Sequence, residues 1–256
     1  MNSYWSKRLA DQLYEKNSQE MLKELRKRYH QASKTMKAVV EDLYFKMLEN
    51  GGEISTTELY KYGRYTQCME ELKRVIKQLG GREEALMIKQ LEIAYKEAFD
   101  KTTLGLGSSI TWGIQNQQVL EEVVNANFKG ANFKTRINTN MNKFLKLLDQ
   151  EVTNCIASGQ SKDIAVKSIM DKTGASFRDS DRLVRTETMR CINAGQIQSY
   201  KDNGYTHGYY LVADDDRLCE YCNKRAMETK KNPEVLTTLD SVHHPNCRCT
   251  IIPIVD

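Results

Sequence analysis

Proline is nearly absent from this sequence, and one long stretch lacks glycine as well. Only three of the 256 residues are proline, and all three lie beyond residue 230. Residues 2–49 contain neither proline nor glycine, the residues that most often interrupt helices. Apolar side chains there are spaced alternately by three and four residues, which is a heptad pattern. This predicts one very long helix, paired either within the chain as a helical hairpin or with another chain as a coiled coil. The repeating positions are Leu22, Leu25, Tyr29, Ala32, Met36, Val39 and Leu43.

Other absences narrow the class of protein. No apolar run approaches the roughly 18 residues of a membrane span, and the first residues lack the apolar stretch of a secretory signal. The net charge of +4 is too small to indicate a nucleic-acid-binding protein by itself. A mean hydropathy of −0.62 favours elongated helices with much exposed surface over one compact core. We expect a protein made in a reducing cytoplasm, where clustered cysteines more often bind metal than form disulfides.

Glycines divide the first half of the chain. The pair at 51–52 should end the long helix, and Ser55 or Thr56 should cap the next one. The pair at 80–81 should break that helix, with a third helix following through residues 87–98.

A change of composition suggests a domain boundary. Residues 102–113 hold three glycines and five serines or threonines, which is typical of a loop. We predict a helical bundle over residues 1–104 and a second domain over residues 105–256. In the second domain, one helix should end at Gly159, and a short one should run from Ser161 to near Gly174.

The next helix, starting at Ser180 or Asp181, has a charged residue on its apolar face. Glu187 falls at the centre of that face, which is formed by Leu183, Val184, Cys191, Ala194 and Ile197. A buried carboxylate needs a partner, because an isolated buried charge costs several kcal/mol. Arg190 is one candidate partner and Arg248 is another, whereas Arg185 points the other way. We interpret Glu187 as a buried anchor between this helix and the C-terminal segment; a catalytic glutamate is the alternative.

A basic stretch precedes these helices. Residues 123–148 contain no acidic residue but six asparagines and three phenylalanines. Basic residues interleaved with aromatic ones can contact a nucleic-acid backbone and its bases. They can equally form a solvated helix face or bind an acidic protein. The residues concerned are Lys129, Lys134, Arg136, Lys143 and Lys146.

After residue 204 the hydropathy pattern changes to a period of two. Residues 207–213 and 249–255 each predict a strand, and Pro253 places the second strand at an edge or near its end. We expect a small sheet packed on the helix that carries Glu187. The predicted fold class is therefore mainly α, with an elongated helical bundle followed by a small α+β domain pinned by cysteines and histidines.

The cysteines and histidines gather between the two strands. The chain offers Cys219 and Cys222 in a C-x-x-C spacing and, after a loop, His244, Cys247 and Cys249, with His243 as a spare. Zinc takes four tetrahedral nitrogen or sulfur ligands, usually as pairs from two short loops. We predict a closed structural zinc site made from four of the five residues. Metal-free thiols and disulfides are the alternatives, and the acidic residues 214–216 before the first pair are expected to form a solvated turn.

A C-x-x-C pair followed by His-His and Asn also resembles the opening of an HNH endonuclease. Those enzymes need a later helix with a further histidine to hold a divalent metal against a phosphodiester. The twelve residues after His244 contain no histidine and predict a strand. A nuclease or a zinc-stabilised DNA-binding module is therefore kept only as an alternative.

Several motifs taken together resemble the phage Mu protein F-like, or phage head morphogenesis, family of minor head proteins. They are L-V-R-T-E-T at 183–188, N-G-Y at 203–205, D-D-D-R-L-C-E-Y-C at 214–222 and H-P-N-C-R-C at 244–249, followed by I-P. The stretches N-F-K-T-R-I-N-T-N at 132–140, G-Q-S-K-D-I at 159–164 and Y-W-S-K-R at 4–8 are similar to parts of such proteins as well.

The resemblance implies a virion assembly protein without enzymatic activity. It would act at the portal and inside the head, in procapsid assembly and in the handling of packaged DNA. The implied partners are the portal protein and a major capsid or scaffolding protein, in the host cytoplasm during assembly and in the virion afterwards.

Overall fold

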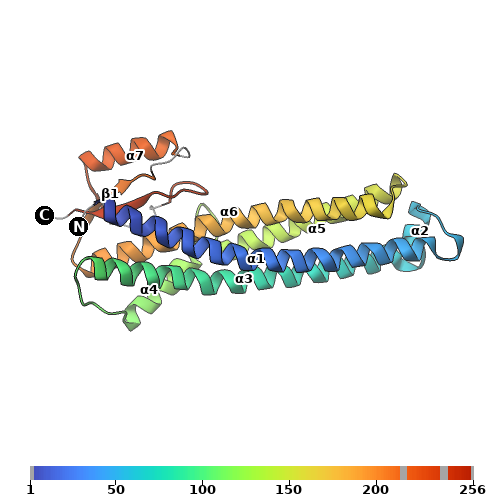
Figure 1. The fold of residues 1–256 in the computed structure, drawn as a ribbon, viewed down its shortest axis with the longest axis horizontal. Helices are drawn as coiled ribbons and strands as arrows, with labels where there is room; N and C mark the ends of the chain where they lie inside the picture. Colours follow the sequence, from blue (N-terminus) through green and yellow to red (C-terminus); the bar gives the residue numbers. More distant parts are fainter. Residues whose placement is uncertain (1–2, 214–217, 237–241, 255–256) are drawn as a thin grey trace. The chain divides into compact units, whose positions relative to one another are not determined.

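The computed structural model describes residues 3–213, 218–236 and 242–254, and most of them are helical (Figure 1). The long helices are α1 (Ser3–Leu48), α3 (Arg64–Gly105), α5 (Phe133–Ala157) and α6 (Lys162–Asp202). The shorter ones are α2 (Thr56–Tyr60), α4 (Ile114–Asn125) and α7 (Glu220–Lys231), with single 3-10 turns at Glu49–Gly51 and Lys61–Gly63. The strands are β1 (His207–Leu211), β2 (Glu234–Val235) and β3 (Thr250–Pro253). The predicted fold class, mainly α with a small α+β part, is confirmed.

The chain forms two compact units, and each is assembled from separate segments. Unit 1 contains Met1–Leu22, Met87–Phe133 and Arg182–Asp256, and unit 2 contains Lys23–Leu86 and Lys134–Asp181. Helices α1, α3 and α6 therefore contribute residues to both units. The predicted boundary between residues 104 and 105 stays a prediction.

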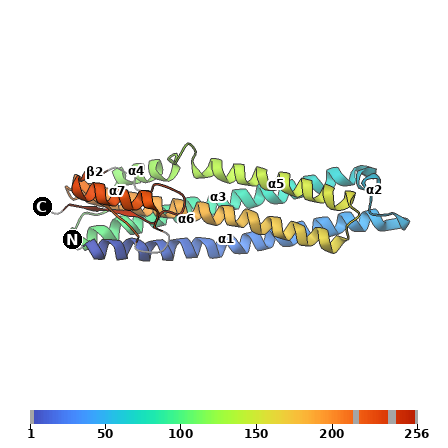
Figure 2. The same ribbon diagram turned by 90° about the horizontal axis from the view of Figure 1, so that it is seen from above.

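Unit 2 is a bundle of long helical segments from α1, α3, α5 and α6, together with the short helix α2 (Figure 2). The predicted seam of α1 is buried in this chain, except that Val40 rather than Val39 faces the core. A polar cluster lies inside the bundle. The Tyr29 hydroxyl is 2.8 Å from Ser180 Oγ and 3.3 Å from Glu83 Oε2, which joins α1, α6 and α3.

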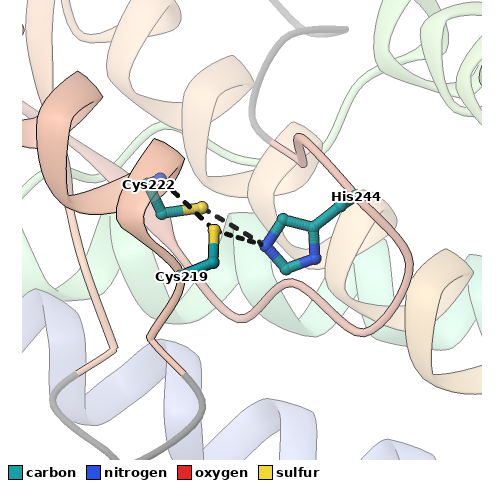
Figure 3. Close-up of side chains that lie close together, drawn as sticks. All are labelled: Cys219, Cys222 and His244. Atoms are coloured by element: carbon teal, nitrogen blue, oxygen red, sulfur yellow. Dashed lines mark hydrogen bonds between the residues drawn. The ribbon is translucent and has the colours of Figure 1, made fainter.

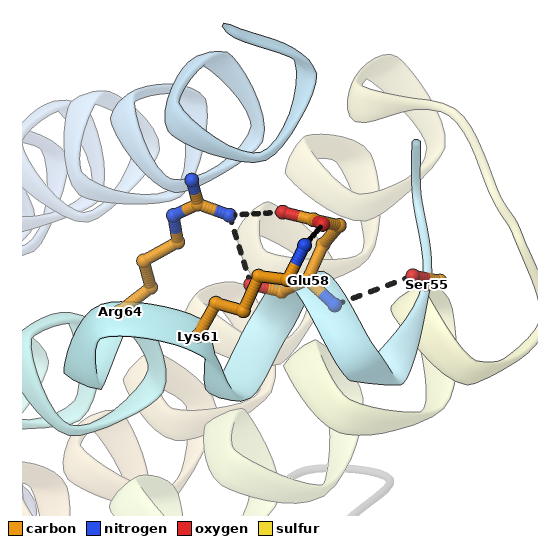
Figure 4. A network of polar contacts seen from close by, with 4 residues as sticks. All are labelled: Ser55, Glu58, Lys61 and Arg64. Atoms are coloured by element: carbon orange, nitrogen blue, oxygen red, sulfur yellow. Dashed lines mark hydrogen bonds and ion pairs between the residues drawn. The ribbon is translucent and has the colours of Figure 1, made fainter. Parts of the chain in front are cut away.

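The connection between α1 and α3 has a cap that the sequence indicates. Ser55 is the N-cap of α2, and its hydroxyl accepts a hydrogen bond from the Glu58 amide at 3.3 Å. The Glu58 carboxylate pairs with Lys61 and, at 2.6 Å, with Arg64, which also donates to the Glu58 carbonyl (Figure 4). Of the two predicted caps, Ser55 is therefore the correct one.

Two predicted helix breaks are wrong. Helix α3 runs through the glycine pair at 80–81, and α6 runs without interruption through Gly174 and Ser180. At Gly80 a Cβ atom would lie 3.0 Å from Met141 Cγ, so this glycine marks a close approach of α5 and not a turn. Gly195 in α6 is similar, because a Cβ there would lie 2.3 Å from the Tyr95 carbonyl oxygen of α3.

Unit 1 contains the sheet, whose strand order is β2-β1-β3 with both pairings antiparallel. Tyr210 pairs with Ile251, and Gly208 pairs with Pro253, which is the last residue of an edge strand as predicted. Helix α7 packs beside β1, where the Thr229 hydroxyl accepts a hydrogen bond from the Tyr210 amide at 3.0 Å. Among the residues with described placement, no helix has the length and apolarity that a bilayer crossing requires.

Candidate metal centre

The first cysteine pair lies at the start of α7. Cys219 is the N-cap of this helix, and Cys222 is in its first turn. The Cys222 amide donates a hydrogen bond to Cys219 Sγ at 3.4 Å. A C-x-x-C spacing across a helix start thus brings the two sulfur atoms close together (Figure 3). The main-chain amides at the N-terminal end of a helix favour negative charge on such groups.

The second pair lies in a tight turn before β3. The Cys247 amide donates to the His244 carbonyl at 3.1 Å, and Asn246 between them has a positive φ of 61°. The Asn246 amide donates to the Thr186 hydroxyl of α6 at 3.0 Å, which fixes the turn to that helix. The turn therefore presents His244 and Cys247 with the same x-x spacing as the first pair.

The side chains of the two pairs converge. His244 Nε2 lies 3.3 Å from Cys219 Sγ and 3.4 Å from Cys222 Sγ, and Cys222 Sγ lies 3.8 Å from Cys247 Sγ (Figure 3). The donor atoms of Cys219, Cys222 and His244 all lie within 4.8 Å of one another, and so do those of Cys222, Cys247 and Cys249. All seven cysteines are free thiols. The five predicted residues are thus brought together in two groups that share Cys222, and the cluster could hold a metal ion.

The space at the cluster is small. Its hollow of about 20 Å³ is lined by all five residues and is close to the minimum needed by a single water molecule. Cys222, Cys247 and Cys249 are buried, and Cys219 and His244 are half-buried. The hollow suits a single ion and is too small for an organic substrate.

The electrostatics of the cluster lower the pKa values of two of its thiols, those of Cys219 and Cys247. The Cys222 amide lowers the pKa of the Cys219 thiol, and a hydrogen bond from the Cys249 thiol lowers the pKa of Cys247 to about 5. Burial raises the pKa of the Cys222 thiol to about 12. A bound divalent cation would supply the positive charge that deprotonates Cys222 as well.

His243, the spare histidine, is directed away from the cluster. Its ring packs between Tyr210, at 4.7 Å between ring centroids, and Tyr221, at 5.2 Å. The acidic residues 214–216, expected to form a solvated turn, lie outside the described residues.

The predicted anchor residues have different partners. Glu187 and Arg190 are both 1% exposed, and Arg190 Nε is 2.7 Å from Glu187 Oε2. Arg190 also donates to the carbonyls of Val123, at 2.6 Å, and Val124, at 3.3 Å, near the end of α4. Arg248 lies 3.8 Å from Glu15, and Arg185 is 3.5 Å from the Tyr14 hydroxyl. Glu187 thus forms an ion pair with Arg190, and Arg190 links α6 to the end of α4 through hydrogen bonds.

Sequence reasoning missed the residues of α6 that hold the C-terminal segment. Besides Thr186, Asn193 donates to the Cys249 carbonyl at 2.8 Å, and Gln196 accepts from the Thr250 hydroxyl at 3.0 Å. Thr186, Asn193 and Gln196 lie on one face of α6 at spacings of seven and three residues, and Asn193 and Gln196 are buried amides. Buried polar residues repeated at helical spacing are the signal that could have indicated them.

The basic residues do not gather at the cluster. Lys129 has a positive φ of 48° in a turn of unit 1, whereas Lys134, Arg136, Lys143 and Lys146 are in α5. Lys134 lies 3.9 Å from Glu84, and Lys143 lies 3.6 Å from Asp179, so both are paired with acidic residues. DNA contact by these five residues stays a prediction.

A comparison with protein families gives a match to the C-terminal part of the chain. Residues 146–252 match the model of the family described as phage Mu protein F like protein. The matched segment contains about half of α5, all of α6 and α7, the Cys/His cluster and most of β3. No curated protein and no solved structure matches the chain. The resemblance of the motifs to the phage Mu protein F-like, or phage head morphogenesis, family is thus confirmed over residues 146–252, somewhat less than half of the chain.

Proposed function

We propose that this chain is a non-enzymatic minor head protein, which acts in procapsid assembly at the portal and in the handling of packaged DNA. The observation that carries the proposal is the family match over residues 146–252. The proposed partners are the portal protein and a major capsid or scaffolding protein. The proposed location is the head interior or portal vertex of the virion, after assembly in the host cytoplasm.

The geometry of the Cys/His cluster supports a structural role over a catalytic one. A catalytic zinc keeps a coordination position open for water or substrate, whereas a structural zinc is enclosed by four protein ligands. Here five donors surround a hollow of about 20 Å³. We propose that zinc is the ion and that it stabilises the segment between α7 and β3, because a three-stranded sheet of this size buries little apolar surface of its own.

The same region argues against the HNH nuclease alternative. The residues that follow the cluster form strand β3, paired with β1, and not the helix on which such an enzyme carries its last metal ligand. His243, which such an enzyme would use, packs between two tyrosine rings. A zinc-stabilised DNA-binding module remains the second candidate because of the lysines of α5.

Co-purification with the portal protein tests the proposal. The full chain should form a stable complex when produced together with the portal protein of the same phage, and should not do so with an unrelated portal. A nuclease assay with added Mg²⁺, Mn²⁺ or Zn²⁺ should show no cleavage of DNA. Metal-dependent cleavage that is lost in His243→Ala, or absence of the portal complex, would overturn the proposal.

A further inference from the structure

The cluster contains two pairs of donor residues that have the same sequence spacing. Cys219 and Cys222 are separated by two residues, and so are His244 and Cys247. Within each pair the second residue donates a main-chain hydrogen bond to the first, from the Cys222 amide to Cys219 Sγ and from the Cys247 amide to the His244 carbonyl. Structural zinc sites are commonly built from two such pairs, with two ligands from each.

Three distances between these donors are close to the edges of a zinc tetrahedron, whereas Cys247 does not lie within 4.8 Å of both Cys219 and His244 and would approach them when an ion is bound. With Zn–S bonds of about 2.3 Å and Zn–N bonds of about 2.0–2.1 Å, tetrahedral geometry places two sulfurs about 3.8 Å apart and a sulfur and a nitrogen about 3.5 Å apart. In this structure Cys222 Sγ and Cys247 Sγ are 3.8 Å apart. His244 Nε2 is 3.3 Å from one cysteine sulfur and 3.4 Å from another.

The tautomer of His244 is suited to this role. Its Nδ1 lies 2.9 Å from the Pro245 carbonyl oxygen, which can only accept a hydrogen bond. Nδ1 therefore carries the proton, and the lone pair is on Nε2, the nitrogen that faces the two sulfurs. A main-chain carbonyl that orients the imidazole in this way is the usual outer partner of a metal-bound histidine.

Cys249 has a different set of contacts. Its sulfur accepts a hydrogen bond from the Ala213 amide and lies within 4.8 Å of the sulfurs of Cys222 and Cys247. Its carbonyl is held by Asn193, and the next residue, Thr250, begins the pairing of β3 with β1. Cys249 is thus fixed through its main chain by α6 and by the strand that follows it.

We propose that Cys219, Cys222, His244 and Cys247 bind one zinc ion through three thiolates and one imidazole, and that Cys249 stays outside the coordination sphere. This assignment rests on the zinc site of the proposed function. It distinguishes Cys247 from Cys249, because Cys247 completes a pair with His244, whereas Cys249 directly precedes strand β3. A set of four thiolates that includes Cys249 and omits His244 is the competing assignment.

Cobalt(II) in place of zinc provides the test. The reduced, metal-free full chain is titrated with Co²⁺, and the thiolate-to-cobalt charge-transfer absorption is recorded, because its intensity rises with the number of bound thiolates. We expect one Co²⁺ per chain. Cys249→Ser should keep the stoichiometry and the full intensity, whereas Cys247→Ser should lose about a third of the intensity, one thiolate of three, and bind at least about tenfold more weakly.

A variant that gains a ligand guards against loss of folding. His244→Cys should raise the charge-transfer intensity by about a third, since it makes a fourth thiolate. Loss of intensity in Cys249→Ser with no change in His244→Ala would overturn the assignment in favour of four cysteines. Two cobalt ions per chain, or none, would overturn it as well. The portal complex is measured separately, so failure of the zinc assignment can be distinguished from failure of the proposed function.

Discussion

Arg190 is a buried charged residue of unit 1, and its guanidinium donates hydrogen bonds to acceptors from two helices, α6 and α4. It pairs with Glu187 and donates to two carbonyls near the C-terminal end of α4. Arg190→Ala would leave the Glu187 carboxylate buried without its cation and the carbonyls without their donor. We expect it to lower the unfolding free energy by about 3–5 kcal/mol. Arg190→Lys should recover only part of this loss, because one ammonium group cannot reproduce the planar fork of the guanidinium.

Urea unfolding followed by circular dichroism measures this effect. Arg185→Ala is the matched control, since Arg185 is in the same helix but is only half-buried and makes a long hydrogen bond to Tyr14. It should lose no more than about 1 kcal/mol. Equal midpoints for the two alanine variants would contradict an anchoring role for Arg190.

Glu83 makes the stability of unit 2 depend on pH. Burial raises the pKa of this carboxyl from 4.5 to about 7, despite its hydrogen bonds from Ser180 and Tyr29. Between these two values the folded protein binds more protons than the unfolded chain, so the unfolding free energy falls as the pH rises through this window. The loss amounts to up to about 3 kcal/mol, the difference in pKa converted to free energy.

Glu83→Gln removes the titrating group and keeps its shape. It should be more stable than the natural chain at pH 8 and similar to it at pH 4, as measured by thermal unfolding across this range. Glu84→Gln, the next residue in α3, is the control and should leave the pH dependence in place. A natural chain whose stability does not change between pH 5 and pH 8 would rule out a buried, titrating Glu83.

At the scale of elements, the glycines of α3 show why the helix breaks were misplaced. A glycine pair permits a turn, but it equally permits a neighbouring helix to approach closely, and local sequence does not distinguish the two. The neighbour that decides between them, Met141 of α5, lies about sixty residues further along the chain. Helix and strand periods were therefore predicted well, since they depend on neighbouring residues. The helix boundaries that depend on packing were not.

The candidate site likewise has one part that the local sequence indicates and another that depends on residues far apart in the chain. The spacing of the cysteines and His244 is enough to indicate a metal cluster, because ligands of one ion come as short local pairs. The polar residues of α6 that contact the C-terminal segment were not predicted. Asn193, for example, donates a hydrogen bond to a main-chain carbonyl 56 residues away, and nothing in the local sequence specifies that partner.

The glycine pair itself offers a matched test of packing against helix propensity. Nothing lies within 4 Å of a Cβ built at Gly81, so Gly81→Ala should stabilise the protein by about 0.5–1 kcal/mol. Gly80→Ala should gain less or lose stability, because Met141 must shift to make room. Chemical denaturation of both variants provides the comparison. A larger gain at position 80 than at position 81 would show that α5 does not approach α3 at Gly80.

For the whole molecule, the distribution of the candidate ligands between the two units has a measurable consequence. All five candidate ligands are in unit 1, where they join α7, the turn at 244–247 and the start of β3. The sheet in this unit has three strands, the shortest with two residues, so a bound ion would supply much of the free energy that holds the segment in place. Hydrogen exchange reports such local stability amide by amide.

Removal of metal with a chelator should therefore raise hydrogen exchange in residues 242–253 and in α7, and more weakly in β1. Exchange in residues 134–181 of unit 2 should be unchanged, because no candidate ligand belongs to that unit. Mass spectrometry of peptides from chelated and zinc-loaded protein makes the comparison, and Cys222→Ser without chelator should reproduce the chelated pattern. An equal rise in both units, or no rise in residues 242–253, would mean that the cluster does not hold the C-terminal segment through a metal.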